Sequence, residues 1–407
     1  MTACAQVVDP PIPPPDAGGQ PMEDAAVDAA PRPDALRGRL DAQVRDAAPD
    51  GASPADALDV PVTRDASPAP PMPDLRSLGV ACYDPGAAYV ESHHRWVVFC
   101  GGHNNTFFRS DDGVHFVEQR MTYVTPAWVW QDPNTGLDRI GGWQPAMLRG
   151  AWYLYFGARD RTNPAPGGTT PHVSLGVFAV PDGPDGPFSD GMSLHNAGDA
   201  VYDAPLVRKT GFTIQDVYPF EDPGPAGDGD TLYVFYNQFN SDKSESGIYV
   251  NRLSDPATSV CCQTQLLRAA RSSGRGRAVR PWAGTTVEAP AVVRDGALVY
   301  LFFSGGLFND VQGRDPFPYQ NGIARAASPL GPFNEYPADR DAPPYYPQLS
   351  CPRMTAALGR SCVLGPGSGA ATADGRFYFN AQLAPERGRS LYRARIVTQA
   401  DGWLGLE

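Results

Sequence analysis

Hydrophobic residues beyond about residue 75 fall into short, almost continuous runs of aromatic and β-branched residues, with no long stretch at helical spacing. Each run leads into small or polar residues, and Gly and Pro punctuate the intervals between runs. Nearly continuous apolar strands indicate sheets that are buried on both faces. Five such runs begin 56 to 80 residues apart, at 96–100, 152–156, 232–236, 299–303 and 376–380.

This recurrence predicts the architecture of the folded part. A repeat of several tens of residues that is built from short strands is typical of one blade of a β-propeller, in which antiparallel sheets surround a central axis. The alternative is a large β-sandwich, but a sandwich does not require an aromatic strand to recur five times after a tight turn. We therefore expect an all-β, five-bladed β-propeller.

Composition separates an N-terminal segment, residues 1–75, from a propeller domain at 76–407. Residues 1–75 lack Phe, Trp and Tyr, hold 15 of the 43 prolines, and carry 12 Asp and one Glu against five Arg. A segment without aromatic residues buries too little apolar surface to offset the entropy lost on ordering. We interpret it as a disordered, extended tether, which is self-repelling because it carries −8 of the net charge of −12.

Charge and hydropathy argue against a nucleic-acid partner for residues 76–407 and against a transmembrane helix. The propeller domain keeps a net charge of only −4, and no basic stripe dominates it, which argues against a nucleic-acid partner. No apolar run approaches the roughly 20 residues that a transmembrane helix needs. We expect a carbohydrate partner, and the sequence leaves the oligomeric state open.

The first four residues resemble the end of a bacterial lipoprotein signal, in which small residues precede a lipidated Cys. The charged and apolar regions of such a signal are missing, so two interpretations stand. Either the start codon is assigned too late and Cys4 carries a lipid anchor, or Cys4 is an ordinary thiol. We expect an extracytoplasmic bacterial protein, secreted or anchored to a membrane at Cys4.

Six cysteines remain once Cys4 is set aside, and six allow 15 disulfide connectivities. Cys82 and Cys100 flank a predicted hairpin, and Cys351 and Cys362 lie eleven residues apart, so both pairs are plausible local bridges in an oxidising compartment. The alternative is a set of reduced core cysteines in a cytosolic protein. The chain has no Cys-x-x-Cys pair, so we expect no zinc site.

Acidic residues mark the predicted innermost strands, whose side chains point toward the propeller axis. Asp84 opens blade 1, Asp216 opens blade 3 and Glu288 opens blade 4. Blade 2 opens with residues 143–145 and blade 5 with residues 365–369. Alone, each acidic residue is more often a turn or strand-end residue than a catalytic one. Three in register around one axis favour a catalytic site.

These motifs resemble glycoside hydrolase family 43, the five-bladed arabinofuranosidases, arabinanases and xylosidases. In that family blade 1 opens with Asp-Pro and blade 2 with Trp-Ala-Pro. Blade 3 has Asp followed by Phe and Asp at four and six residues, and blade 4 opens with Glu-Ala-Pro or Glu-Gly-Pro. The corresponding motifs here lie at 84–85, 143–145, 216–222 and 288–290, and the resemblance covers roughly residues 80–407.

The resemblance implies an inverting glycoside hydrolase that acts on arabinofuranosidic or xylosidic bonds of plant-type polysaccharide. Asp84 would be the general base that activates water, and Glu288 the general acid. Asp216 would orient Glu288 and raise its pKa by like-charge repulsion. Inversion leads us to expect roughly 6.5–9.5 Å between the carboxyl groups of Asp84 and Glu288. Arabinofuranose, xylose and galactofuranose are all compatible with this scaffold.

Aromatic side chains near the axis are candidates for binding the sugar. Trp143 is the first candidate, followed by Tyr83 and by Phe308 in the loop after blade 4. For the loop aromatics, packing between blades is an equally good interpretation.

One residue departs from the family pattern. In many members blade 5 opens with Gly-x-Gly-His, and that His lies near a bound cation; Ser368 occupies its place here. We therefore predict no metal and no cofactor. Ser368 also favours an alternative in which the chain is a catalytically silent surface propeller that binds glycan or protein. A phosphorolytic propeller is a third alternative, for which the arginine-rich run at 268–280 would supply the anion site.

Overall fold

The computed structural model describes residues 74–101, 106–138, 140–165, 170–180, 183–186, 204–224, 231–260, 263–270, 272–279, 283–284, 286–308, 319–336 and 348–407. The predicted tether up to residue 73, Cys4, Cys261 and Cys262 lie outside the described residues. No helix within the described ranges is both long enough and apolar enough to cross a bilayer.

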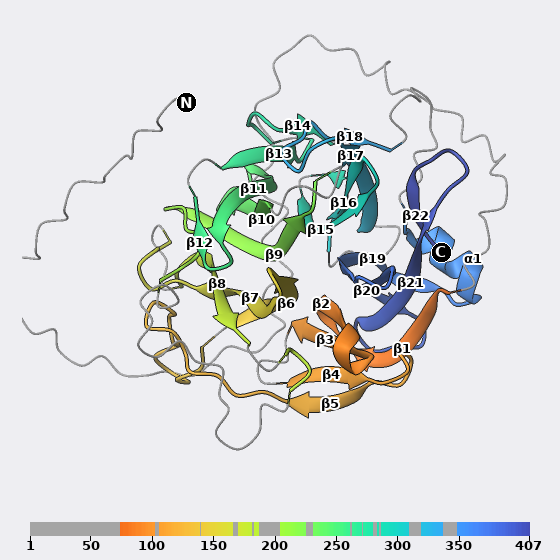
Figure 1. Ribbon diagram of the computed structural model, residues 1–407, viewed down its shortest axis with the longest axis horizontal. Coiled ribbons are helices and arrows are strands. Elements are labelled where there is room, and N and C mark those ends of the chain that lie inside the picture. Colours follow the sequence, from red (N-terminus) through yellow and green to blue (C-terminus); the bar gives the residue numbers. More distant parts are fainter. Residues whose placement is uncertain are drawn as a thin grey trace, which may run out of the picture. The chain divides into compact units, whose positions relative to one another are not determined.

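Five sheets, built from the described residues and antiparallel except for one short parallel pair in the third, surround a central axis, and the predicted five-bladed β-propeller is confirmed (Figure 1). Each blade runs outward from an innermost strand. Blade 1 contains β2 (Tyr83–Val90), β3 (Arg95–Gly101), β4 (Thr106–Ser110) and β5 (Val117–Arg120), and the short 3-10 helix η3 (Glu91–His93) precedes β3. Blade 2 contains β6 (Ile140–Leu148), β7 (Ala151–Arg159) and β8 (Val173–Ala179).

Blades 3 and 4 follow the same order. Blade 3 contains β9 (Phe212–Asp222), β10 (Thr231–Asn240), β11 (Ser246–Asp255), β12 (Thr258–Ser259), β13 (Thr264–Arg268) and β14 (Arg277–Ala278). Blade 4 contains β15 (Val287–Asp295), β16 (Leu298–Gly305), β17 (Gln320–Ala326) and β18 (Asn334–Glu335).

Blade 5 joins the two ends of the propeller domain. Its C-terminal strands are β19 (Cys362–Ala371), β20 (Arg376–Leu383), β21 (Ser390–Thr398) and β22 (Leu404–Leu406). The first strand of the domain, β1 (Arg76–Ala81), pairs antiparallel with β21 and completes this blade, as the neighbouring orange and blue strands in Figure 1 show. The ring is thereby closed by hydrogen bonds between the N-terminal and C-terminal parts of the domain.

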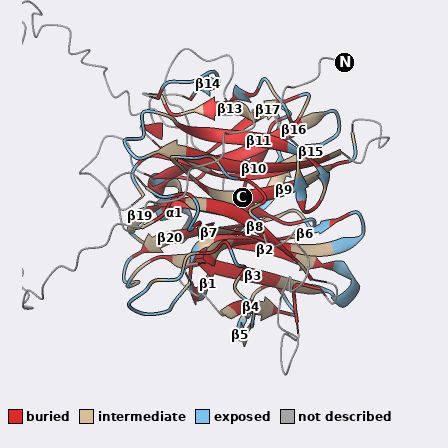
Figure 2. Cartoon of the chain, turned by 90° about the vertical axis from the view of Figure 1, so that its left-hand side faces the viewer, coloured by how far each residue is buried: buried red, intermediate tan, exposed pale blue. Residues whose placement is uncertain are grey.

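The five predicted aromatic runs are the second strands of their blades, β3, β7, β10, β16 and β20. These strands are largely buried, and Figure 2 shows the buried strands in red against pale blue exposed loops. Phe99, Phe156, Phe235, Phe302 and Phe379 are all 0% exposed. Each fully buried side chain of this size stabilises the fold by about 1.5–3 kcal/mol, so the second strands fix the blade packing.

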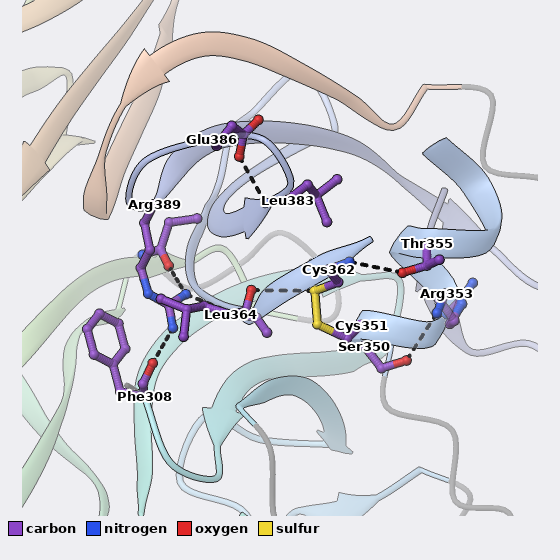
Figure 3. The surroundings of a disulfide bond; sticks show 12 residues. Phe308, Ser350, Cys351, Arg353, Thr355, Cys362, Leu364, Leu383, Glu386 and Arg389 are labelled. Carbon is purple, nitrogen blue, oxygen red and sulfur yellow. Dashed lines mark hydrogen bonds between the residues drawn. A yellow bond between two sulfur atoms is a disulfide. The ribbon is translucent and has the colours of Figure 1, made fainter. Parts of the chain in front are cut away.

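Both disulfides expected from spacing are present. Cys82 is bonded to Cys100 across blade 1, and Cys351 is bonded to Cys362. The second bond ties the helix α1 (Cys351–Leu358) to the innermost strand of blade 5 (Figure 3). Two disulfides within the propeller favour an oxidising compartment.

Removing the Cys82–Cys100 bond should destabilise the protein. The bond closes a loop of 18 residues, and a loop of this length contributes about 3 kcal/mol in the chain-entropy model. We expect a Cys82→Ala/Cys100→Ala variant to melt at a lower temperature by circular dichroism without reductant. Adding reductant to the parent protein should lower its melting temperature as well. An unchanged melting temperature in the double variant would contradict this account of blade 1.

Candidate active site

All five innermost strands contain an irregularity at the same level of the propeller. In each strand the pairing with the second strand shifts register, and one residue within the shift has a positive φ. A bulge of this kind redirects side chains, here relative to the propeller axis. A left-handed backbone at a non-glycine residue costs about 1–3 kcal/mol and is typical of functional sites. The five residues are Asp84, Gly142, Asp216, Ala289 and Ser368.

These bulges line one cavity, to which every blade contributes through its innermost strand. The volume of the cavity is about 30 Å³, which leaves room for one or two water molecules. The strands approach closely around it: a Cβ atom on Gly86 would lie 1.7 Å from the carbonyl oxygen of Trp143, so only glycine fits at this position of β2. Asp84, Asp216 and Ser368 are among the polar residues that border the cavity.

Asp216 contacts the strand that carries Glu288. Its Oδ2 accepts a hydrogen bond of 3.2 Å from the backbone N–H of Ala289, the residue that follows Glu288. Burial raises the pKa of the Asp216 carboxyl well above its ordinary value, and the charges of Glu288 and Asp84 raise it further. The three carboxyl groups predicted from sequence therefore interact with one another at this site.

Glu288 is held by a tyrosine. The Tyr319 hydroxyl donates a hydrogen bond of 2.7 Å to Glu288 Oε1. Burial raises the pKa of Glu288, and the charge of Asp84 adds to this effect. The hydrogen bond from Tyr319 and the charges of Lys243 and Arg389 oppose the shift. Burial is thus the largest cause of the raised pKa of Glu288, and the like-charge repulsion that the resemblance implies acts between Glu288 and Asp216 beside it.

A hydroxyl group and a buried arginine both act on the pKa of Asp84. Burial raises the pKa of its carboxyl, while a hydrogen bond from Ser368 and the charge of Arg389 oppose the shift. Arg389 is 1% exposed and donates to the carbonyl oxygen of Gly365 at 2.8 Å and to Asn380 Oδ1 at 2.7 Å. It places a fixed positive charge near the carboxylates.

An aromatic surface adjoins this arginine. Figure 3 shows Phe308 beside Arg389, whose guanidinium group lies 4.0 Å from the centre of the Phe308 ring. The ring centre of Tyr83, a residue that is 42% exposed, lies 6.5 Å from that of Phe308, and the ring centre of Tyr319 lies 5.2 Å from that of Phe308. Two of the predicted sugar-binding candidates, Tyr83 and Phe308, are thus neighbours of the residues that hold Glu288 and Asp84.

The prediction for Trp143 is wrong. Trp143 borders the cavity through its place in β6, but the residue is 1% exposed and its ring packs against Tyr123, Phe156 and Phe178. The bulge around Gly142 lies next to this residue, and the side chain belongs to the hydrophobic core that blades 1 and 2 share. It offers no exposed face to a sugar.

Two residues of this site were not found from the sequence. Tyr319 belongs to none of the motifs that mark the other site residues, and Arg389 looks in sequence like any surface arginine. Among the described residues, no group of three or more His, Cys, Asp or Glu side chains is placed to hold a metal ion.

The raised pKa of Asp216 predicts a pH-dependent gain in stability on substitution. A carboxyl whose pKa is higher in the folded than in the unfolded state stabilises the fold fully below its unfolded pKa of about 3.9. That contribution is lost as the pH rises through the folded pKa, since the ionised form is then buried. We expect Asp216→Asn, which stays neutral, to raise the melting temperature at pH 8 and to have little effect at pH 4.

Thermal unfolding at pH 4, 6 and 8 checks this. Asp111→Asn is the matched control, because the Asp111 side chain is 75% exposed and forms an ion pair with Arg95 at the surface. A lower melting temperature of Asp216→Asn at pH 8 would show that Asp216 acts as a structural ion instead.

Comparisons with known proteins agree with this architecture. The family model described as glycosyl hydrolases family 43 matches residues 81–343. None of the curated protein sequences compared with the chain matches it. Solved structures share the fold at low sequence identity.

Three of these structures have TM-scores between 0.53 and 0.56. An endo-1,4-β-xylanase from Bacteroides thetaiotaomicron is 17% identical, with 82% of this chain and 96% of that chain covered and a TM-score of 0.54. An α-L-arabinofuranosidase from Lactobacillus brevis is 15% identical over 81% and 94%, with a TM-score of 0.56. An exo-1,5-α-L-arabinanase from a bovine ruminal metagenomic library is 18% identical over 80% and 97%, with a TM-score of 0.53.

Proposed function

Because the chain belongs to glycosyl hydrolases family 43, we propose that it cleaves arabinofuranosidic or xylosidic bonds of plant-type polysaccharide with inversion of configuration. The observation that carries this proposal is the convergence of three carboxyl groups from three different blades. Asp84 and Asp216 border one cavity with room for a water molecule, and the charge of Glu288 acts on Asp216. The names of the structurally similar xylanase, arabinofuranosidase and arabinanase support the two sugars.

The proposed chemistry uses the carboxyl groups in different protonation states. Ionised Asp84 takes a proton from water as the water attacks the anomeric carbon. Protonated Glu288 gives its proton to the oxygen of the leaving sugar. The charge of Asp84 raises the pKa of Glu288, so ionisation of the base favours the protonated form of the acid. Asp216 holds the backbone next to Glu288 through the N–H of Ala289.

This assignment predicts a bell-shaped pH dependence of kcat/KM. Activity should fall at acid pH as Asp84 becomes protonated, and at alkaline pH as Glu288 ionises. Burial raises both pKa values, so both limbs should lie above the ordinary carboxyl values of 3.8 and 4.5. A profile of kcat/KM against pH at constant ionic strength checks this. An apparent pKa at or below the ordinary value for either limb would contradict the assignment.

A substrate panel tests the function itself. The full chain and its Asp84→Asn variant are compared on p-nitrophenyl α-L-arabinofuranoside, β-D-xyloside and β-D-galactofuranoside, and on linear arabinan and xylan. Turnover of an arabinose or xylose substrate that the variant loses supports the proposal. Turnover of the galactofuranoside alone would show that the protein releases galactofuranose and not arabinose or xylose. If the folded protein turns over none of these substrates, the alternative of a catalytically silent propeller that binds glycan or protein is favoured.

We further propose that the protein works outside the cytoplasm. Two disulfides in the propeller support this, because such bonds persist in oxidising compartments. Mass spectrometry of the N-terminal peptide from native membranes tests the anchor: a diacylglycerol adduct on Cys4 is expected, and an unmodified thiol would exclude lipidation.

A further inference from the structure

One oxygen of the Glu288 carboxyl group is occupied by a buried hydroxyl group. The Tyr319 hydroxyl donates to Oε1 at 2.7 Å, and no other residue in the described part of the chain donates a hydrogen bond to this carboxyl group. Oγ of Ser368 lies 3.0 Å from the same hydroxyl. A tyrosine hydroxyl has one proton to donate, so Tyr319 uses it on Glu288 and Ser368 supplies the proton of the second contact. Both hydrogen bonds therefore point toward Oε1.

This arrangement decides which oxygen of Glu288 carries the proton of the acid. In a protonated carboxyl group the carbonyl oxygen is the better acceptor, and the other oxygen carries the proton. Oε1 accepts from Tyr319, so the proton is placed on Oε2. When Glu288 gives this proton away, a negative charge forms on the carboxyl group, and the hydrogen bond from Tyr319 becomes charge-assisted and stronger.

We propose that Tyr319 is the positioning residue of the general acid, which directs the proton of Glu288 to Oε2 and stabilises the carboxylate that forms when the sugar leaves. This inference rests on the proposed function. In the step, the proton on Oε2 passes to the leaving oxygen as the bond from that oxygen to the anomeric carbon breaks. The oxygen of water bonds to the same carbon, and a proton of the water passes to Asp84. Tyr319 keeps its own proton throughout.

Two glycines that open blade 5 make room for Tyr319. A Cβ atom on Gly365 would lie 1.8 Å from the backbone carbonyl oxygen of Tyr319, and one on Gly367 would lie 1.8 Å from its ring. Every other residue type adds this atom, so only glycine fits at both positions. Tyr319 itself is 1% exposed. The close contact with β19 therefore fixes the place of the tyrosine hydroxyl.

Ser368, which follows Gly367, is fixed to blade 4 at the level of Glu288. Its backbone N–H donates to Oγ of Ser304 at 2.8 Å, and Asn321 Nδ2 donates to the same oxygen at 3.2 Å. Ser304 is the cross-strand neighbour of both Glu288 and Asn321. Ser368 is kept at a φ of 43° although it is not a glycine, which is typical of functional sites. The donor that faces the Tyr319 hydroxyl is thus held as firmly as the tyrosine.

The Tyr319 hydroxyl stays protonated beside the carboxyl groups. Burial raises its pKa well above the ordinary value, and the charges of Glu288 and Asp84 raise it further. It therefore donates a hydrogen bond and does not ionise. The charged groups that act on Glu288 or are acted on by it are Asp84, Asp216, Lys243 and Arg389. All four remain unchanged when only the hydroxyl of Tyr319 is removed.

The test compares the full chain with Tyr319→Phe and with the control Tyr300→Phe. Tyr300 is also 1% exposed and lies in blade 4, and its hydroxyl donates to the carbonyl oxygen of Gly402 at 3.0 Å. The control therefore loses a buried hydrogen bond that does not involve a carboxyl group. Kinetics are measured on the unactivated disaccharide of the sugar that the panel identifies, over a range of pH, and on its p-nitrophenyl glycoside.

We expect Tyr319→Phe to lower kcat on the disaccharide by roughly 10- to 100-fold, the effect of losing a hydrogen bond to a charged group. The loss on the p-nitrophenyl glycoside should be much smaller, because its leaving group needs no proton. The hydrogen bond from Tyr319 lowers the pKa of Glu288, so the alkaline limb of kcat/KM should move to higher pH by about one unit. Tyr300→Phe should leave this limb in place.

A structural role of Tyr319 would shift the limb in the opposite direction. Disturbed packing admits water, and burial is the largest cause of the raised pKa of Glu288, so the limb would then move to lower pH. Carbon-13 NMR of protein labelled at the Glu carboxyl carbons, assigned with Glu288→Gln, measures the same pKa without substrate.

The outcomes separate this inference from the proposed function. In an active parent, a Glu288 pKa that stays or falls in Tyr319→Phe, or equal losses on the two substrates, would overturn the role of Tyr319 alone. A parent that hydrolyses nothing would overturn the proposed function, and with it the role of Tyr319 in catalysis, whatever the titration of Glu288 shows.

Discussion

Replacing Glu288 by Gln is expected to lower kcat on an unactivated disaccharide by about 10³-fold, within the range of 10²–10⁴ that general acid catalysis contributes. Gln keeps the shape of the side chain, and its carbonyl oxygen still accepts the hydrogen bond that Tyr319 donates to Glu288. It has no proton to give to a departing sugar alkoxide. On a p-nitrophenyl glycoside the loss should be much smaller, because p-nitrophenolate leaves without protonation.

The difference between the two substrates is therefore the informative quantity. Steady-state kinetics on both substrates measures it, and Glu118→Gln serves as the control, because Glu118 is exposed on β5 in blade 1. Equal losses on both substrates would show that Glu288 supports folding or binding and does not donate the proton.

Replacing Asp84 by Asn should lower kcat by about 10³-fold on the disaccharide and on the p-nitrophenyl glycoside alike. Both reactions need a base that takes a proton from the attacking water, whatever the leaving group. The variant should also fold, since the substitution removes a carboxyl group whose ionised form is disfavoured by burial.

Kinetics on the same two substrates checks this prediction. Asp111→Asn, at an exposed position of blade 1, is the control for a general effect of losing a carboxylate. If Asp84→Asn keeps activity on the p-nitrophenyl glycoside and loses it only on the disaccharide, Asp84 is acting as the acid and the two roles must be exchanged.

The fold was predictable because its signal is local. Each second strand carries a run of large apolar residues, and burial of Phe99 or Phe302 on both faces demands that composition. The two disulfides were predictable in the same way, since short sequence separation brings Cys82 close to Cys100 and Cys351 close to Cys362. The closure of blade 5 by β1 joins strands that are distant in sequence, and no local pattern marks it.

The site was predictable only where a motif marks it. Asp84, Asp216 and Glu288 stand beside characteristic neighbours, so family resemblance identifies them. The direction of Trp143 depends on the bulge in β6, which interrupts the alternation of side chains that sequence reasoning assumes. Tyr319 and Arg389 became visible only when folding placed them against Glu288 and Asp84.

The stereochemistry of the first product tests most directly whether Asp84 acts as the general base and Glu288 as the general acid. Proton NMR during the first minutes of hydrolysis, before the freed sugar equilibrates, distinguishes the two anomers of the sugar that the panel identifies. The account predicts an anomer of inverted configuration, because Asp84 activates water and forms no bond to the sugar. A first product of retained configuration would contradict it, because a carboxylate would then act as a nucleophile and a covalent intermediate would replace the direct attack of water.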